Sequence, residues 1–250
     1  FLSAQFPRRV RETLPYSAAA LLVCVLAGVA GFAAVMADPE TASAFIPETL
    51  RRHVESRMSS GEMDGPSLPL DLSPLLSSAI LFNNVRVAVL SFGLGITAGL
   101  GTVCVLIQNG LLLGALAGIA ARHEASAAFW ALILPHGVIE MAAIFIAAGS
   151  GLKIAHALIA PGDLTRRDAL VRAAREVTPL LLGAVSMLAV AALVEGFLTP
   201  APVPDSVKLA FGGATLCLLV AYFALAGRGR HRDGRHDPAR LESGLRGKQV

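Results

Sequence analysis

Long apolar runs alternate with polar connections along most of the chain. Four runs are clearly delimited and each has at least 20 residues: 16–37, 127–149, 177–198 and 207–226. About 20 residues of helix, at 1.5 Å per residue, cross the roughly 30 Å hydrocarbon core of a bilayer. The pattern therefore predicts an all-α protein, a polytopic bundle of transmembrane helices. A cleaved leader is the alternative for the first run, but its 22 residues exceed the about 7–15 apolar residues of a leader.

Residues 81–121 are apolar almost without interruption and are harder to divide. These 41 residues are too many for one span and barely enough for two. We divide them into spans at 82–104 and 108–121, which makes six spans in all. The alternative is five spans plus a re-entrant hairpin at Asn109 and Gly110, because non-helical backbone is tolerated at membrane depth where protein buries it.

The distribution of basic residues separates these two topologies. With six spans and a cytoplasmic N-terminus, fifteen lysines and arginines lie in the cytoplasm and five lie outside, whereas five spans reverse the counts. Cytoplasmic loops carry the excess of Lys and Arg in membrane proteins. The prediction is therefore six spans, both termini in the cytoplasm, and a single membrane domain covering residues 1–226.

The polar connections differ in character. Residues 38–80 contain five prolines and seven acidic residues, which predicts a solvated connection with one short surface helix at 48–58. Residues 163–176 contain four arginines and are predicted to form a short amphipathic helix on the cytoplasmic side. Residues 227–250 are rich in glycine and arginine and are predicted to be a disordered basic tail in the cytoplasm.

Composition supports a membrane protein and favours membrane lipid over nucleic acid as the partner of its basic tail. The chain is 54% hydrophobic and 16% charged, which is unusual for a soluble domain. Its net charge of +3 arises in the tail, where residues 228–250 hold seven basic and three acidic side chains. No aromatic residues lie among these arginines, so we expect a flank that contacts membrane lipid rather than nucleic acid. The three cysteines lie in separate apolar runs and indicate neither a disulfide framework nor a zinc site.

Polar side chains inside the apolar runs are the candidate functional residues. An ionised side chain at the bilayer centre costs about 2.5–3.5 kcal/mol, so each such group needs a partner. Pro135 removes a backbone hydrogen bond and predicts a kink or break in its span. His136 and Glu140 are four residues apart and share one helical face. On the six-span topology several groups fall in the outer half of the membrane and could converge: Asn83, Asn84, His136 and Glu195.

Two interpretations of this cluster remain open. In one, the amides and His136 satisfy the backbone near Pro135, and Glu140 is neutral or paired with Arg86, giving an inert network between helices. In the other, His136 and Glu140 form a proton or cation site, with Arg86 and Glu195 as candidate partners. Metal and serine-hydrolase chemistry are disfavoured, because the chain contains no HExxH and no Gly-x-Ser-x-Gly motif. We therefore expect no cofactor, no metal and no enzymatic activity.

Glycines recur at the spacing that allows helices to approach closely. The pairs Gly95/Gly99, Gly110/Gly114 and Gly114/Gly118 each place two small residues four positions apart. In lipid, such pairs let two helix backbones come into contact. The spacing therefore predicts close helix packing at these positions, and it leaves the oligomeric state open.

Several short blocks in a characteristic order resemble the stage II sporulation protein M family. They are Phe82-Asn83-Asn84, Phe92-Gly93-Leu-Gly95, Asn109-Gly110 followed by Gly114, Leu134-Pro135-His136-Gly137 with Glu140, and Gly149-Ser-Gly151. The resemblance implies a polytopic helical protein of the bacterial inner membrane. The family motif corresponds to Asn83, Asn84, Asn109, Gly110, Pro135, His136, Gly137 and Glu140, and it implies no established catalytic role for them.

The same resemblance implies two kinds of partner. The namesake is similar to an anchor that recruits peptidoglycan-cleaving enzymes during spore engulfment, and many relatives are found alongside a MoxR-type AAA ATPase. Our leading hypothesis is therefore a non-enzymatic membrane scaffold. The rival hypothesis is a small permease or ion-coupled transporter that uses His136 and Glu140.

Overall fold

The computed structural model describes residues 1–48, 50–52, 73–198 and 201–228, with no side-chain detail for 73–80. Over these ranges the chain is helical and contains no strand, which confirms the all-α class. The elements are α1 (Gln5–Glu12), α2 (Leu14–Ala37), η1 (Pro39–Thr41), α3 (Ala42–Phe45), α5 (Ser73–Gly93), η3 (Leu94–Thr97), α6 (Leu100–Arg122), α7 (Ser126–Ile159), α8 (Arg166–Leu198) and α9 (Asp205–Leu225).

Five of these helices are long and apolar enough to cross a membrane, namely α2, α6, α7, α8 and α9. A shorter apolar helical segment, Leu81–Thr97, covers the end of α5 and the turn η3. Many of their large apolar side chains face outward, for example Leu26, Leu193 and Leu218. Exposed apolar surface of this extent, spread along the long helices, is typical of a membrane-facing surface. The chain is therefore a multi-pass membrane protein.

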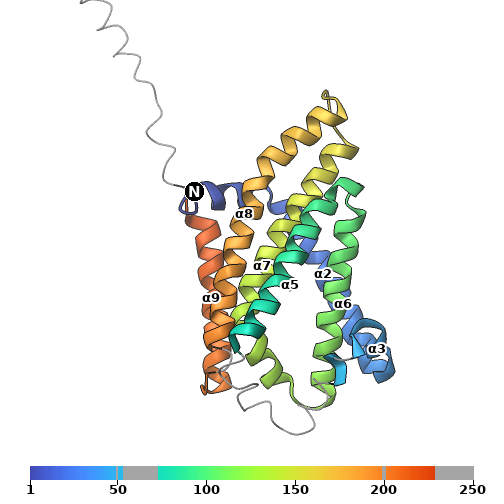
Figure 1. Cartoon of the computed structure of the whole chain (residues 1–250), viewed down its shortest axis with the longest axis vertical. Helices are drawn as coiled ribbons and strands as arrows, with labels where there is room; N and C mark the ends of the chain where they lie inside the picture. Colours follow the sequence, from blue (N-terminus) through green and yellow to red (C-terminus); the bar gives the residue numbers. More distant parts are fainter. Residues whose placement is uncertain (49, 53–72, 199–200, 229–250) are drawn as a thin grey trace, which may run out of the picture.

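The long helices run alternately up and down, so the connections gather at two ends of the bundle (Figure 1). Helix α1, the turn between α5 and α6, the α7–α8 connection and the last turn of α9 lie at one end, which we call the basic end. The first and last described segments meet there, because Arg11 donates hydrogen bonds to the carbonyl oxygens of Phe223 at 2.6 Å and Ala226 at 2.9 Å. Helix α3 and the α6–α7 and α8–α9 connections lie at the opposite end.

The predicted boundary between the two helices of residues 81–121 is in the wrong place. The chain reverses direction at 94–99, not between 104 and 108, and Ala98 and Gly99 adopt positive φ angles of 52° and 84° there. A Cβ at Gly95 would overlap the carbonyl of Gly151, so this turn lies directly on the backbone of α7. Helix α6 continues without interruption through Asn109 and Gly110, so the alternative of a re-entrant hairpin at those residues is also wrong.

Two other predicted boundaries differ from the structure. Helix α7 continues through Pro135, so no break occurs there, and α8 likewise continues through Pro179. The segment predicted as a separate amphipathic helix at 163–176 is mostly the first part of α8 and is continuous with the apolar part that follows. Of the surface helix predicted at 48–58 only residues 48 and 50–52 are described, and the tail from residue 229 onward lies outside the described residues.

Glycines allow α2 and α6 to pack backbone against backbone. A Cβ at Gly114 would overlap the carbonyl oxygen of Gly28, and one at Gly110 would overlap the carbonyl oxygen of Cys24. A Cβ at Gly118 would lie 3.0 Å from the Cβ of Val35. The predicted close packing at the Gly110/Gly114/Gly118 spacing is therefore confirmed, with α2 as the partner helix.

Helix α7 is the central helix of the bundle. It packs against α2, α5, α6, α8 and α9, and most of its residues from Pro135 to Ala155 are buried or half-buried. Small residues permit this: Ala143 and Ala147 of α7 pack against Ala184 and Leu188 of α8 and Ala88 of α5. Any polar side chain on this part of α7 is therefore enclosed by neighbouring helices rather than exposed to lipid.

Candidate functional site

Polar side chains from α5, α7 and α8 gather inside the bundle. His136 and Glu140 of α7 and Glu195 of α8 are only 8%, 9% and 7% exposed. The side chain of Asn84, on α5, hydrogen-bonds the carboxyl group of Glu140. Glu140 and Glu195 lie close enough to interact electrostatically, and we call these two residues the carboxyl pair. The two residues belong to α7 and α8, the two longest helices of the bundle.

Some polar atoms of this cluster lack a hydrogen-bond partner. Within the described part of the chain, Nδ1 of His136 and Oε2 of Glu195 are buried and unpaired. A buried polar atom left unpaired costs about 1–3 kcal/mol. The cluster is therefore not a closed network in which every group satisfies another, and it retains the capacity to bind a proton, a water molecule or an ion.

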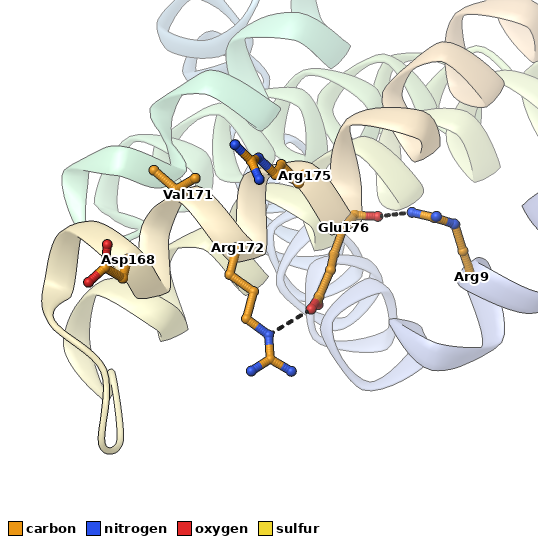
Figure 2. Close-up of a pocket in the computed structure, with 6 residues that line it drawn as sticks. All are labelled: Arg9, Asp168, Val171, Arg172, Arg175 and Glu176. Carbon is orange, nitrogen blue, oxygen red and sulfur yellow. Dashed lines mark hydrogen bonds and ion pairs between the residues drawn. The ribbon is translucent and has the colours of Figure 1, made fainter.

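A second polar region lies at the basic end, on the surface (Figure 2). A pocket of about 360 Å³ is lined by Arg9, Asp168, Val171, Arg172, Arg175 and Glu176. Glu176 is its central residue: its carbonyl oxygen accepts a hydrogen bond from Arg9 at 2.7 Å, and its carboxylate pairs with Lys153 at 2.9 Å and Arg172 at 3.1 Å. Nearby, the hydroxyl of Tyr16 contacts Nδ1 of His156. These contacts tie α1, α7 and α8 together.

Comparison with known proteins identifies the family. The family model for stage II sporulation protein M matches residues 17–200, from the start of α2 to just beyond α8. The chain belongs to the stage II sporulation protein M family. The resemblance that the sequence motifs predict is thereby confirmed. The chain is also 34% identical over 129 residues to an uncharacterized protein of Methanocaldococcus jannaschii, an overlap of 49% of this chain and 70% of that protein. No solved structure matches it.

The helices of this family member bring some of the motif residues together and separate others. Asn84 and Glu140 are joined by a hydrogen bond, and His136 lies one turn from Glu140 on α7, between buried Pro135 and Gly137. The remaining motif positions lie outside the cluster and have other surroundings: Asn83 is exposed on α5, Asn109 donates to the carbonyl oxygen of Val105 in its own helix, and Gly110 contacts α2.

The two candidate partners of the cluster, Arg86 and Glu195, have different surroundings in the structure. Glu195 is buried, and its carboxyl group lies within electrostatic range of Glu140. Arg86 is exposed, and no ion pair among the described residues joins it to either carboxyl group. The described residues contain no group of three or more His, Cys, Asp or Glu side chains placed to hold a metal ion. Arg86 is therefore not an ion-pair partner of Glu140 in the described structure.

The contacts of the basic end were not foreseen from the sequence. Tyr16 and His156 are 140 residues apart, and Arg9 and Glu176 are 167 residues apart. No local pattern links such positions, because only the folded bundle brings them together. The family model begins at residue 17, so it does not include α1 and its contacts with α8 and α9.

The ion pairs of Glu176 predict a small pH dependence of stability. Lys153 and then Arg172 hold the pKa of this carboxyl below its ordinary value, against the opposing effect of partial burial. A lowered pKa stabilises the folded state above the unfolded-state pKa of about 4.3, and this stability is lost as pH falls through the folded-state pKa. Because the carboxylate is 43% exposed, solvent screening limits the effect to below about 1 kcal/mol.

Thermal unfolding of the purified protein and of Glu176→Gln checks this expectation. The wild type should unfold at a slightly higher temperature than the variant at about pH 7, and the two should converge as pH falls below the lowered folded-state pKa of Glu176, where the carboxyl is protonated in both states. Exposed Glu124→Gln is the matched control and should show no such convergence. A difference for Glu176→Gln that stays constant with pH would contradict a charge effect.

Proposed function

We propose that this member of the stage II sporulation protein M family is a non-enzymatic membrane scaffold that binds a partner protein at its basic end. The observation that carries the proposal is the length of two helices. Helix α7 has 34 residues and α8 has 33. Each is therefore about 50 Å long, whereas the hydrocarbon core is about 30 Å thick. The α7–α8 hairpin extends past the other helices at the basic end (Figure 1).

The projecting part of the hairpin is a rigid element rather than a loose loop. Small residues on its two helices, Ala155, Ala169 and Ala173, are buried. Ile154 packs in a cluster with Phe6 and Val177, which links the hairpin to α1 and to the rest of α8. A docking surface held in this way binds a partner without first having to be ordered, and ordering would reduce affinity.

The exposed surface of the hairpin combines basic and apolar side chains. Arg166, Arg167 and Arg175 are exposed, and so are Ile159 and Leu164. Positive groups around apolar side chains fit a partner with an acidic surface and an apolar anchor. The surface is therefore suited to a protein partner.

The distribution of basic residues supports a cytoplasmic position for this surface. In the described residues the basic end holds most lysines and arginines, and the cytoplasmic parts of membrane proteins carry the excess of these residues. We therefore propose that the basic end lies in the cytoplasm and that six spans cross the bacterial inner membrane. A cytoplasmic hairpin fits a partner such as a MoxR-type AAA ATPase better than a peptidoglycan-cleaving enzyme, whose substrate lies outside the membrane. Both kinds of partner remain expectations from the family resemblance.

Site-specific photo-crosslinking in living cells tests the scaffold. A photoreactive amino acid at Val171 or Arg167 should capture a protein partner, because both side chains are exposed on the hairpin. The same probe at Glu124, which is exposed at the opposite end, is the matched control. The probes on the hairpin should crosslink more protein than the probe at position 124. Equal or lower crosslinking at the hairpin would contradict docking at the basic end.

The polar cluster supports a second candidate function, an ion-coupled permease. The observation that favours it is the buried Oε2 of Glu195, which has no hydrogen-bond partner among the described residues. Glu140→Gln separates the two functions, because glutamine keeps the shape and the hydrogen bond with Asn84 but cannot carry the charge. A scaffold should keep its crosslinked partner and its function in cells with this substitution. Loss of function with the partner still bound would favour the permease.

A further inference from the structure

We propose that one face of α8 binds an anionic phospholipid, with the headgroup phosphate in the pocket of Figure 2 and an acyl chain along an apolar groove next to it. We call the pocket the basic pocket. The apolar groove has a volume of about 690 Å³ and is lined by Phe1, Leu2, Ser3, Pro179, Leu182 and Ser186. This lipid site goes beyond the scaffold function and does not depend on it.

The basic pocket and the apolar groove lie on one continuous face of α8. Six of the α8 residues that line them follow one another at steps of three or four: Asp168, Arg172, Arg175, Pro179, Leu182 and Ser186. This spacing keeps side chains on the same face of a helix. The first three line the pocket and the last three line the groove. A single extended ligand can therefore contact both.

The arginines of the basic pocket have donors available for a phosphate. Arg9 of α1 and Arg172 of α8 each donate one hydrogen bond to Glu176. A guanidinium group has five N–H donors, so both keep others for a ligand. Arg175 is exposed and has no hydrogen bond or ion pair within the described part of the chain. Arginine binds phosphate through paired hydrogen bonds, and basic pockets at the membrane surface bind anionic headgroups.

The two acidic side chains of the basic pocket already have partners. The carboxylate of Glu176 pairs with Lys153 and Arg172. Asp168 accepts a hydrogen bond from the hydroxyl of Thr165 at 2.7 Å. When Lys153 is included with the lining residues, four basic side chains face two acidic ones. The net positive charge favours an anion in the pocket.

The change from basic to apolar along this face coincides with the start of the span. The apolar run 177–198 begins directly after Glu176. Arg175 and Ser186 are 11 residues apart, which corresponds to about 16 Å of helix. One leaflet contributes about half of the roughly 30 Å hydrocarbon core, so the apolar groove has the depth of one acyl chain. Leu182 is 63% exposed on the groove, as expected for a side chain that contacts hydrocarbon.

Other ligands fit this face less completely. A soluble anion such as inorganic phosphate would contact the basic pocket alone and would leave the apolar groove uncovered. A zwitterionic lipid carries its own cation, which would face the arginines. An anionic phospholipid has a phosphate without a neighbouring cation and an acyl chain attached to it, so its two parts match the pocket and the groove.

Native mass spectrometry of the full chain in detergent tests the lipid site. The delipidated protein is titrated with dioleoyl phosphatidylglycerol or with dioleoyl phosphatidylcholine. We expect one phosphatidylglycerol molecule per chain to be retained at concentrations at which phosphatidylcholine is not. Arg175→Glu should weaken phosphatidylglycerol binding about tenfold or more, because it removes charge-assisted hydrogen bonds to the phosphate. Arg166→Glu is the matched control, because Arg166 is exposed on the opposite face of α8.

A second pair of variants tests the apolar groove. Leu182→Gln should also weaken phosphatidylglycerol binding, because it places a polar group against the acyl chain. Leu218→Gln makes the same change at a 70% exposed position of α9 and should not weaken it. Thermal unfolding should show that all four variants are folded, since each substitution is on the surface.

Several results would overturn the lipid site. Equal retention of the two lipids, or of neither, would mean that no selective site exists. Equal loss in Arg175→Glu and Arg166→Glu, or in Leu182→Gln and Leu218→Gln, would mean that this face of α8 is not involved. Displacement of phosphatidylglycerol by excess inorganic phosphate would assign the basic pocket to a soluble anion. A dimer that only Leu182→Gln dissociates would assign the face to a second copy of the chain.

Discussion

Replacing Gly114 with alanine is expected to lower the unfolding temperature of the protein markedly. A Cβ at this position would overlap the carbonyl oxygen of Gly28, and backbone atoms have no rotamer that relieves the overlap. Overpacking of this kind costs about 1–3 kcal/mol or more. Gly114→Leu should be more severe and should prevent α2 and α6 from packing. Thermal unfolding in detergent, followed by size-exclusion chromatography, measures both effects.

Gly213→Ala is the matched control for this substitution. A Cβ at Gly213, in α9, meets no atom within 4 Å. The same chemical change in an open position should leave stability unchanged or raise it by up to about 1 kcal/mol, because alanine favours a helix more than glycine does. If the two variants unfolded at the same temperature, the α2–α6 contact would not depend on the absence of a side chain at 114.

Replacing Phe6 with alanine is expected to release α1 from the bundle. Phe6 is 1% exposed, fits over Gly183 of α8 and packs edge-on against Phe223 of α9 at 5.9 Å between ring centroids. Phe→Ala in a packed core costs about 3–5 kcal/mol. Helix α1 has only 8 residues, too few for a helix to be stable alone. Hydrogen exchange of Gln5–Glu12 should therefore become much faster.

Phe1→Ala provides the comparison for Phe6→Ala. Phe1 is 50% exposed, so its removal should change exchange in α1 only slightly. The Tyr16–His156 contact at the start of α2 should persist in both variants, because it lies outside α1. Slow exchange of Gln5–Glu12 in Phe6→Ala would mean that the hydrogen bonds of Arg9 and Arg11 hold α1 without its apolar side chains.

The hydrophobic pattern predicts the long helices, but it does not predict where one helix ends and the next begins. The length of the apolar runs identifies α2, α7, α8 and α9, because any helix that crosses the hydrocarbon core needs about 20 apolar residues. It cannot identify the reversal at 94–99, since the residues on both sides are equally apolar. The signal there is the group Gly93, Gly95 and Gly99, which the sequence presents only as packing glycines. Gly99 and Ala98 instead adopt the positive φ angles of the turn.

Proline does not end the helix in which it lies. Pro135 predicts a kink or break, and the structure excludes the break, because α7 continues through this residue. In a bundle, neighbouring helices and local adjustments satisfy the backbone group that proline leaves free. The amphipathic segment before residue 177 likewise continues as α8 rather than forming a separate helix. Where a helix ends outside the apolar region depends on its packing against other helices, and the amino-acid composition does not show that packing.

The sequence singles out the polar residues of the candidate site but does not show which of them lie near one another. The cost of burying charge singles out Glu140 and His136 from the sequence alone. Arg86 and Glu195 were equally eligible partners, because a linear sequence does not show which face of a helix meets α7. The structure buries Glu195 within electrostatic range of Glu140 and leaves Arg86 exposed. In the described residues no ion pair therefore joins Arg86 to Glu140.

The meeting of α1 with α9 has a consequence for the order of events during synthesis. Arg11 and its acceptor at Phe223 are 212 residues apart, so at about 5–20 residues per second roughly 10–40 seconds pass between their translation. During that time Phe6 and Val10 have no α9 to cover them. A ribosome that stalls early would therefore leave the apolar face of α1, which carries Phe6 and Val10, without the cover of α9.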